Sequence, residues 1–154
     1  MSKVLSCVRC GFCGFDKVGA YLGPLGLRLL LAWEFWEAGV MKLHGENWFV
    51  DIADKFPFPF NVIPLDVNWA LVTWFEILGA IALVLGLATR FVSLSLMILT
   101  AVAIVSVHAG NGYTISEGGW KLPLMYLVMF LPLLLSGAGK LSLDHWIVKM
   151  TSKA

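Results

Sequence analysis

Two apolar stretches decide the fold: VNWALVTWFEILGAIALVLGLA at residues 67–88 and FVSLSLMILTAVAIVSVHA at residues 91–109. Each is close to the roughly 20 residues that a helix needs to cross about 30 Å of hydrocarbon. Two similar stretches flank them, at residues 18–41 and 120–136. The sequence therefore predicts an all-α fold, specifically a four-helix transmembrane bundle.

The composition points to the same class of protein. Of the 154 residues, 59% are hydrophobic and 14% are charged, against about 45–50% and about 25% in soluble domains. The mean hydropathy is +0.83. So short a chain has too little interior to hide that much apolar surface, which argues strongly against a soluble globular domain and leaves the lipid bilayer as its surroundings. The net charge of +1 gives no reason to expect a nucleic-acid partner.

Basic residues indicate the orientation. They lie before residue 18, between the second and third stretches, and after residue 136: Lys3, Arg9, Lys17, Arg90, Lys140, Lys149 and Lys153. Residues 43–66 contain only Lys55, and residues 110–119 contain none. Because cytoplasmic loops are rich in Lys and Arg, both termini are expected in the cytoplasm. We expect a cytoplasmic Cys-containing segment at 1–17, a membrane domain at 18–146 and a cytoplasmic tail at 147–154.

The first outer loop contains an amphipathic segment. Trp48, Phe49, Ile52 and Phe56 fall on one helical face, while the charged residues around them lie elsewhere. This pattern predicts a short interfacial helix. A plain connecting loop is the alternative.

Charged residues inside the apolar stretches suggest an ion pair. Arg28 and Glu76 lie close to the centres of the first and second stretches. A charge at such a depth costs roughly 2.5–3.5 kcal/mol on insertion scales, and pairing offsets much of it. We therefore predict an intramembrane Arg28–Glu76 pair. It could serve as a structural staple or as part of a site for a polar ligand or proton.

A second polar layer is expected nearer the outer surface. Glu37, His108 and Lys121 each lie about two turns outward of the middle of their stretch, and Lys42 lies one turn further out. We take these four residues as ligand-binding candidates for an anionic headgroup, a quinone oxygen or a thiol compound. Alternatively, each side chain meets water and headgroups separately.

Three cysteines lie near the N-terminus. Cys7, Cys10 and Cys13 repeat at a spacing of three, and thiols at this spacing can bind a soft ion such as Cu(I) or Zn(II). They are the candidate metal ligands. Reactive thiols on a terminal tail are the alternative reading.

An ordered set of short motifs resembles the DoxX family. The set comprises residues 36–43 (WEAGVMKL), the Phe-Pro-Phe-Pro loop at 56–59, residues 76–79 (EILG) with 86–90 (GLATR), His108, and residues 136–144 (SGAGKLSLD). Within the family, residues 35–39 (FWEAG) and 46–49 (ENWF) look most like the branch called HvfX. The Cys-rich start departs from the family pattern.

The resemblance implies a multi-pass, four-helix protein of the bacterial inner membrane. Family members are linked to thiosulfate–quinone oxidoreduction and to thiol stress, and the HvfX branch to maturation of copper-binding modified peptides. Quinone and copper are thus the implied cofactors, and proteins of a redox or peptide-maturation system are the implied partners. The family's polar positions would be occupied by Arg28, Glu37, Lys42, Glu76, Arg90 and His108.

Three functional hypotheses follow. The first is a DoxX-type accessory protein that holds a small polar or quinone-like ligand, with a subunit of a membrane oxidoreductase complex as the enzymatic version. The second is a non-catalytic scaffold that docks soluble enzymes. The third is a small transporter or proton conduit that uses the intramembrane carboxylates as relays.

Overall fold

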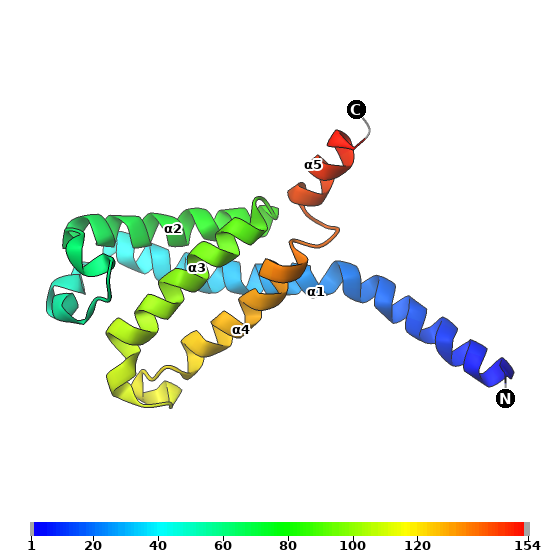
Figure 1. Cartoon of the computed structure of the whole chain (residues 1–154), viewed down its shortest axis with the longest axis horizontal. Coiled ribbons are helices and arrows are strands. Elements are labelled where there is room, and N and C mark those ends of the chain that lie inside the picture. The colour runs from blue at the N-terminus through cyan, green and yellow to red at the C-terminus, as the bar shows by residue number, and fades with distance from the viewer. Residues whose placement is uncertain (1, 153–154) are drawn as a thin grey trace.

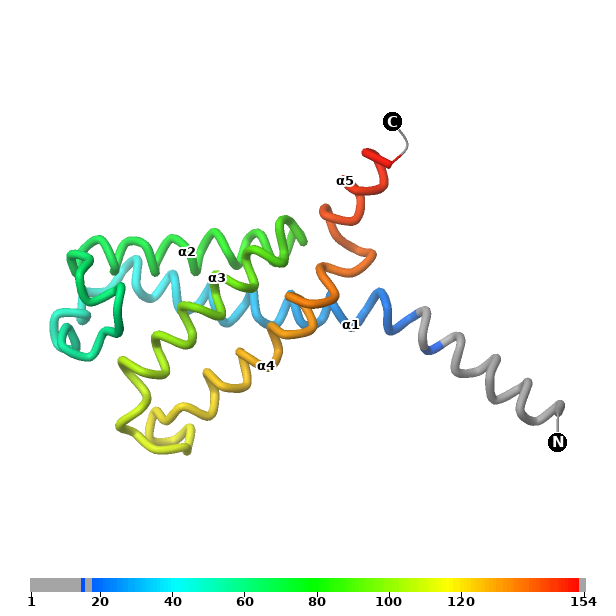
Figure 2. The backbone as a smooth tube through the Cα atoms, viewed as in Figure 1, coloured from blue at the N-terminus to red at the C-terminus, as the bar shows by residue number. Residues whose placement is uncertain are grey.

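The computed structural model describes residues 2–152, with side chains for Phe15 and residues 18–152. The described residues form helices and no strand (Figures 1 and 2). In chain order the elements are α1 (Ser2–His44), η1 (Trp48–Lys55), η2 (Phe60–Val62), α2 (Leu65–Leu85), α3 (Thr89–Ala103), η3 (Ile104–His108), η4 (Ala109–Asn111), η5 (Ile115–Glu117), α4 (Lys121–Ser136) and α5 (Leu143–Thr151). The all-α prediction is confirmed. The expected segment boundaries at 17/18 and 146/147 fall inside α1 and α5.

Two helical segments are long and apolar enough to cross a membrane. They are α2 and the continuous segment Thr89–Asn111, which contains α3, η3 and η4. The apolar helix α4 is shorter. Large apolar side chains cover the outward faces of these helices, including Leu78 at 58% exposed and Val128 at 57%. Such faces suit lipid, because a soluble monomer rarely exposes so much contiguous apolar surface.

A small apolar core joins α1, α2, α3 and α4. Its fully buried members are Leu31, Leu83, Leu96, Phe130 and Leu133. Phe35 of α1 packs its ring against that of Phe130, with 5.4 Å between the centroids. The core holds the four helices together along the middle of the bundle.

Gly39 sets the register between α1 and α2. A Cβ at this position would lie 2.7 Å from Cγ1 of Ile77 and 3.2 Å from Cβ of Glu76. Only a residue without a side chain lets the two backbones approach so closely. In the antiparallel pair, Gly39 therefore stands level with Glu76, and Arg28 stands level with the far end of α2.

The bundle has two different ends (Figure 1). The end that we call the Arg28 end contains the α2–α3 connection and the segment 137–144, and Asp144 N–H donates to Gly86 O at 3.0 Å there. The opposite end, which we call the cavity end, contains η1, η2 and the loop that leads into α4. The predicted short helix in the first loop forms as η1, at this end.

Candidate functional site

A cavity of about 340 Å³ opens at the cavity end. Its volume lies within the usual range of small-molecule sites. The walls are mostly apolar, and the polar side chains that line it are Glu34, Lys42, Asn68, Glu76, Thr100, Ser106, His108 and Tyr126. These residues come from α1, α2, α3, η3 and α4, so the site exists only in the assembled bundle.

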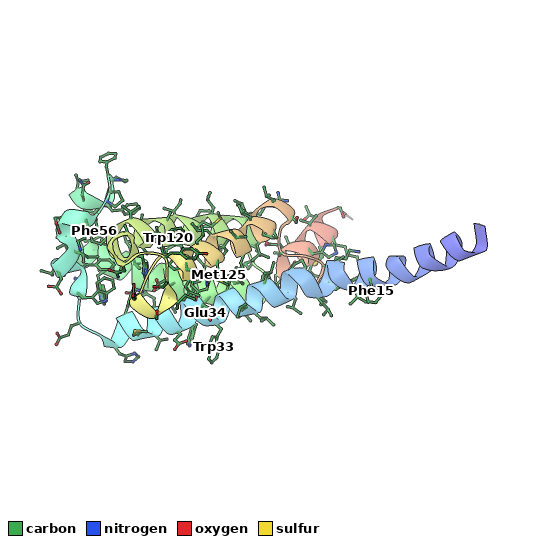
Figure 3. All side chains as sticks on the ribbon, turned by 90° about the horizontal axis from the view of Figure 1, so that it is seen from below. Phe15, Trp33, Glu34, Phe56, Trp120 and Met125 are labelled. Carbon is green, nitrogen blue, oxygen red and sulfur yellow. The ribbon has the colours of Figure 1, made fainter. Side chains whose placement is uncertain are left out.

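One wall is formed by η1 and its aromatic residues. Trp48, Phe49, Ile52 and Phe56 all line the cavity, although the backbone kinks at Ile52 and Phe56 follows the last residue of η1. Phe49 and Phe56 are buried, with 5.0 Å between their ring centroids. Figure 3 labels Phe56 at this end of the molecule. These rings cover the side of the cavity that the helices leave open.

An ion pair between α1 and α2 lines the cavity. Lys42 Nζ donates to Glu76 Oε1 at 3.0 Å and to Oε2 at 2.8 Å. The side chains are 16% and 9% exposed. Such a bidentate, nearly buried pair neutralises the charge of Glu76 inside an apolar wall.

The predicted Arg28–Glu76 pair is wrong. Both residues lie at one depth when depth is counted from the middle of each apolar stretch, whereas the Gly39 contact sets a different register. Glu76 consequently meets Lys42, which lies one turn beyond Gly39 and reaches back toward it. Arg28 lies more than two turns of α2 away from Glu76, at the other end of the bundle.

Arg28 instead binds backbone carbonyls. Its guanidinium donates to Ala138 O at 2.8 Å, Leu141 O at 2.9 Å and Val84 O at 3.3 Å. The residue is 1% exposed. Because the last carbonyls of a helix lack partners within it, Arg28 satisfies the end of α2 and fixes the segment after α4. Arg28 thus joins α2 to the segment after α4 through main-chain contacts, and not through a carboxylate as the sequence predicted.

A second polar contact crosses the cavity end between α1 and α4. The hydroxyl of Tyr126 donates to Glu34 Oε2, and both residues line the cavity. Figure 3 shows Glu34 on α1, whereas its neighbour Trp33 points away from the bundle and is 67% exposed. Neither Glu34 nor Tyr126 was among the predicted site residues. The available signals were a carboxylate at Glu34, in a stretch that also contains Arg28 and Glu37, and a phenol at Tyr126 in a mostly apolar stretch.

The predicted outer layer is only partly assembled. Lys42 and His108 line the cavity, but Glu37 and Lys121 do not. Glu37 is exposed, because it lies about 140° around α1 from Lys42. Lys121 Nζ lies 5.6 Å from the centroid of the Tyr113 ring. Equal depth along three helical segments does not bring side chains together when they point in different directions.

His108 belongs to the turn η3, which follows α3 and contacts the end of η1. Its Nδ1 lies 2.6 Å from Gly118 O. In the same π-helical turn, Ser106 Oγ donates to Lys55 O at 3.3 Å. Wide turns of this kind occur frequently at functional sites. Here the turn directs Ser106 and His108 toward the cavity.

Of the remaining predicted residues, Arg90 is the one whose side chain the structure describes, and it does not line the cavity. Arg90 is exposed and donates to Leu135 O at 3.2 Å. The side chains of Cys7, Cys10 and Cys13 lie outside the described residues. Among the residues that are described, no group of three or more His, Cys, Asp or Glu is placed to hold a metal ion.

Comparisons with known proteins identify relatives along most of the chain. A protein of Haemophilus influenzae described as uncharacterized is 49% identical over 138 residues, which cover 90% of this chain and 91% of the relative. A second uncharacterized protein of that organism is 41% identical over 78 residues, covering 48% of this chain and 58% of the relative. No solved structure shows significant similarity.

The family assignment rests on the central part of the chain. Residues 23–109 match the DoxX family. This range begins within α1, contains α2 and α3, and carries the Lys42–Glu76 pair together with His108. Because the match spans more than half of the 154 residues, this chain belongs to the DoxX family, which is membrane-associated.

Proposed function

We propose that this protein is a multi-pass protein of the bacterial inner membrane that holds a small amphiphilic ligand in the cavity beside Lys42 and Glu76. The observation that carries the proposal is the cavity itself, of about 340 Å³, with apolar walls and a charged pair along one side. Apolar walls with a few convergent polar groups are typical of small-molecule sites. The candidate ligand-contacting residues are Glu34, Lys42, Glu76, His108 and Tyr126.

The proposal includes four membrane spans with both termini in the cytoplasm. The Arg28 end carries the connection with Arg90, and the segment after α4 carries Lys140 and Lys149. At the cavity end, the loop of residues 43–66 contains Lys55 as its single Lys or Arg. This asymmetry favours a cytoplasmic Arg28 end. The cavity and η1 would then lie at the outer surface, with η1 in the headgroup region.

The biological setting is inferred from the resemblance to the HvfX branch. We propose an accessory role in a redox or thiol system, or in the maturation of copper-binding modified peptides. The cavity favours ligand binding over a purely docking scaffold, because a scaffold has no need of a hollow lined by buried polar groups. The bidentate Lys42–Glu76 contact favours a stationary pair over a proton relay, since both carboxylate oxygens are engaged by one ammonium.

Co-purification tests the proposal directly. The full chain is purified in mild detergent, and small molecules and metals extracted from it are identified by mass spectrometry. Ala103→Phe places a ring in the cavity, because Ala103 lines it. Ala101→Phe is the matched control on the same helix, since Ala101 is exposed and does not line the cavity.

The expected result is a compound that accompanies the wild-type protein and Ala101→Phe in equal amounts. Ala103→Phe should lose at least about 90% of it, because a filled cavity excludes the ligand. Equal amounts in all three proteins, or none in any of them, would contradict the proposed ligand site.

A further inference from the structure

Among the described side chains that line the cavity, every hydrogen-bond donor except the indole N–H of Trp48 is already engaged, and this restricts the ligand. Lys42 has three ammonium protons. Two point to the carboxylate oxygens of Glu76, and Ala38 O lies 3.5 Å from Nζ as the third partner. An anionic ligand would therefore have to displace Glu76 from its own counter-ion, which would leave a buried carboxylate unpaired.

The donors on the α2 and α4 walls are also engaged. Asn68 Nδ2 donates to Phe60 O at 2.7 Å and to Ile63 O at 3.4 Å. Tyr126 gives its only proton to Glu34. Neither residue has a proton left for a ligand.

The side-chain donors on the α3–η3 wall also have acceptors within the protein. Thr100 Oγ1 donates to Leu96 O at 2.7 Å, and Ser106 Oγ donates to Lys55 O at 3.3 Å. A carbonyl can only accept, so the contact of His108 Nδ1 with Gly118 O assigns the proton of the neutral ring to Nδ1. Its Nε2 is then an acceptor. Within the described part of the chain, only Trp48 adds a lining side-chain donor without a protein acceptor, and its side chain is exposed.

Acceptors, by contrast, remain available. Glu34 accepts from Tyr126 through Oε2, and among the described residues no donor engages its Oε1. Glu76 keeps lone pairs beyond the two that face Lys42, and Asn68 keeps its carbonyl oxygen. The cavity thus offers oxygen and nitrogen lone pairs within walls rich in Phe and other apolar side chains.

We propose that the cavity selects an amphiphile whose ring donates hydrogen bonds, namely a hydroxylated aromatic such as a quinol or an alkylphenol, over the corresponding quinone and over anions. The aromatic wall of Phe49 and Phe56 suits a flat ring, and Glu34 Oε1 accepts the ring hydroxyl. A quinone carries only acceptor oxygens, so its lone pairs would face the lone pairs of the acceptor atoms in the cavity wall. This inference rests on the proposed ligand-binding function and names the ligand class for the same cavity.

A matched pair of probes tests the inference. Tetramethylhydroquinone and its oxidised form, tetramethylbenzoquinone, are titrated without oxygen against the full chain in lipid nanodiscs, with quenching of tryptophan fluorescence as the readout. Ala103→Phe supplies the background from partition into lipid. We expect the hydroquinone to bind about tenfold more tightly than the quinone, since a hydrogen bond to a carboxylate separates the two forms.

Two variants localise the effect. Glu34→Gln keeps a carbonyl for Tyr126 but presents an amide donor to the cavity, and it should lower the hydroquinone-to-quinone affinity ratio by about tenfold. Glu37→Gln removes an exposed carboxylate one turn along α1 and should leave the ratio unchanged.

The possible results distinguish a failure of donor selectivity from a failure of ligand binding in the cavity. If the quinone binds as tightly as the hydroquinone, or if Glu34→Gln keeps the wild-type ratio, the donor-selective site is wrong while the ligand cavity stands. If neither probe binds above the Ala103→Phe background and no compound co-purifies, the ligand cavity fails as well.

Discussion

The two ends of the bundle both hold a charged side chain between helices, but they use it differently. Arg28 is surrounded by backbone carbonyls, and the segment after α4 closes over it. Lys42 meets a carboxylate, and a cavity remains beside the pair. The contacts of Arg28 join separate chain segments, whereas the Lys42–Glu76 pair forms part of the wall of a cavity.

The Arg28 end gains further support from Asp144. Its carboxylate accepts from Ala88 N at 2.7 Å and from Thr89 N at 2.9 Å, at the start of α3. Gly86 fits between these groups with φ +65°, and a Cβ there would collide with the Arg28 guanidinium. Arginine and aspartate thus satisfy the end of α2 and the beginning of α3 at one corner. This corner is a structural joint, and it predicts stability effects without direct effects on ligand binding.

The strongest test of the joint is Arg28→Met. It should lower the free energy of unfolding by about 3–5 kcal/mol, because three carbonyls lose a charged donor and the site is buried. Unfolding is measured by titrating the protein in mild detergent with a denaturing detergent. Arg90→Met, which removes an exposed arginine with one carbonyl contact, should cost less than about 1 kcal/mol. Equal losses in the two variants would show that Arg28 does not hold this end.

At the cavity end, Lys42→Met should have a smaller effect on stability. We expect a loss of about 2 kcal/mol, because Glu76 is left without its counter-ion beside a cavity that water can enter. The double variant Lys42→Met/Glu76→Gln should recover most of the loss, since no unpaired charge remains. Both variants should change probe binding, whereas Arg28→Lys should alter stability alone. A double variant as unstable as the single one would contradict the pairing.

Gly39→Ala tests the close approach of α1 and α2, which sets the register between these two helices. The added methyl group would press against Ile77 and Glu76, and it should cost about 1–2 kcal/mol. Gly23→Ala is the control on the same helix, because a Cβ there meets nothing within 4 Å. The control should be neutral or stabilising by up to about 1 kcal/mol. If both substitutions stabilise the protein, Gly39 does not set the helix register.

The smallest expected effect comes from Asp144→Ala. Loss of the two contacts to the start of α3 should cost about 1 kcal/mol. Asp144→Asn, which keeps an acceptor oxygen, should recover part of this loss. Ligand binding at the opposite end should stay at the wild-type level in both variants, measured by the same fluorescence titration. A change in binding affinity without a change in stability would show that the two ends are coupled.

The sequence was sufficient to predict the long apolar helices and some of the residues that line the cavity. Apolar runs of helical length predicted α2 and the segment through α3, because no other regular structure satisfies every backbone group inside lipid. The spacing of Trp48, Phe49, Ile52 and Phe56 grouped these four residues, but as the apolar face of an interfacial helix and not as a cavity wall. Lys42 and His108 were selected as candidates because polar residues in apolar stretches are costly without a purpose.

The pairing of the charges was outside what the sequence could determine. Arg28 and Glu76 were matched by depth, but depth along a helix says nothing about the direction of a side chain or about the register of its neighbour. Glu34 and Tyr126 were missed for a related reason, since their contact joins residues that are 92 positions apart. Glu37 was included because it lies at the expected depth, although it faces away from the cavity.

The amino-acid sequence by itself determined that this chain is helical, apolar and suited to a membrane, because length and hydropathy are properties of each segment alone. The tertiary structure decided which charge meets which partner and where a hollow remains. The physical reason is packing, because the close contact at Gly39 sets the register of α1 against α2. In this register Lys42 lies beside Glu76, and Arg28 lies beside the carbonyls at the opposite end.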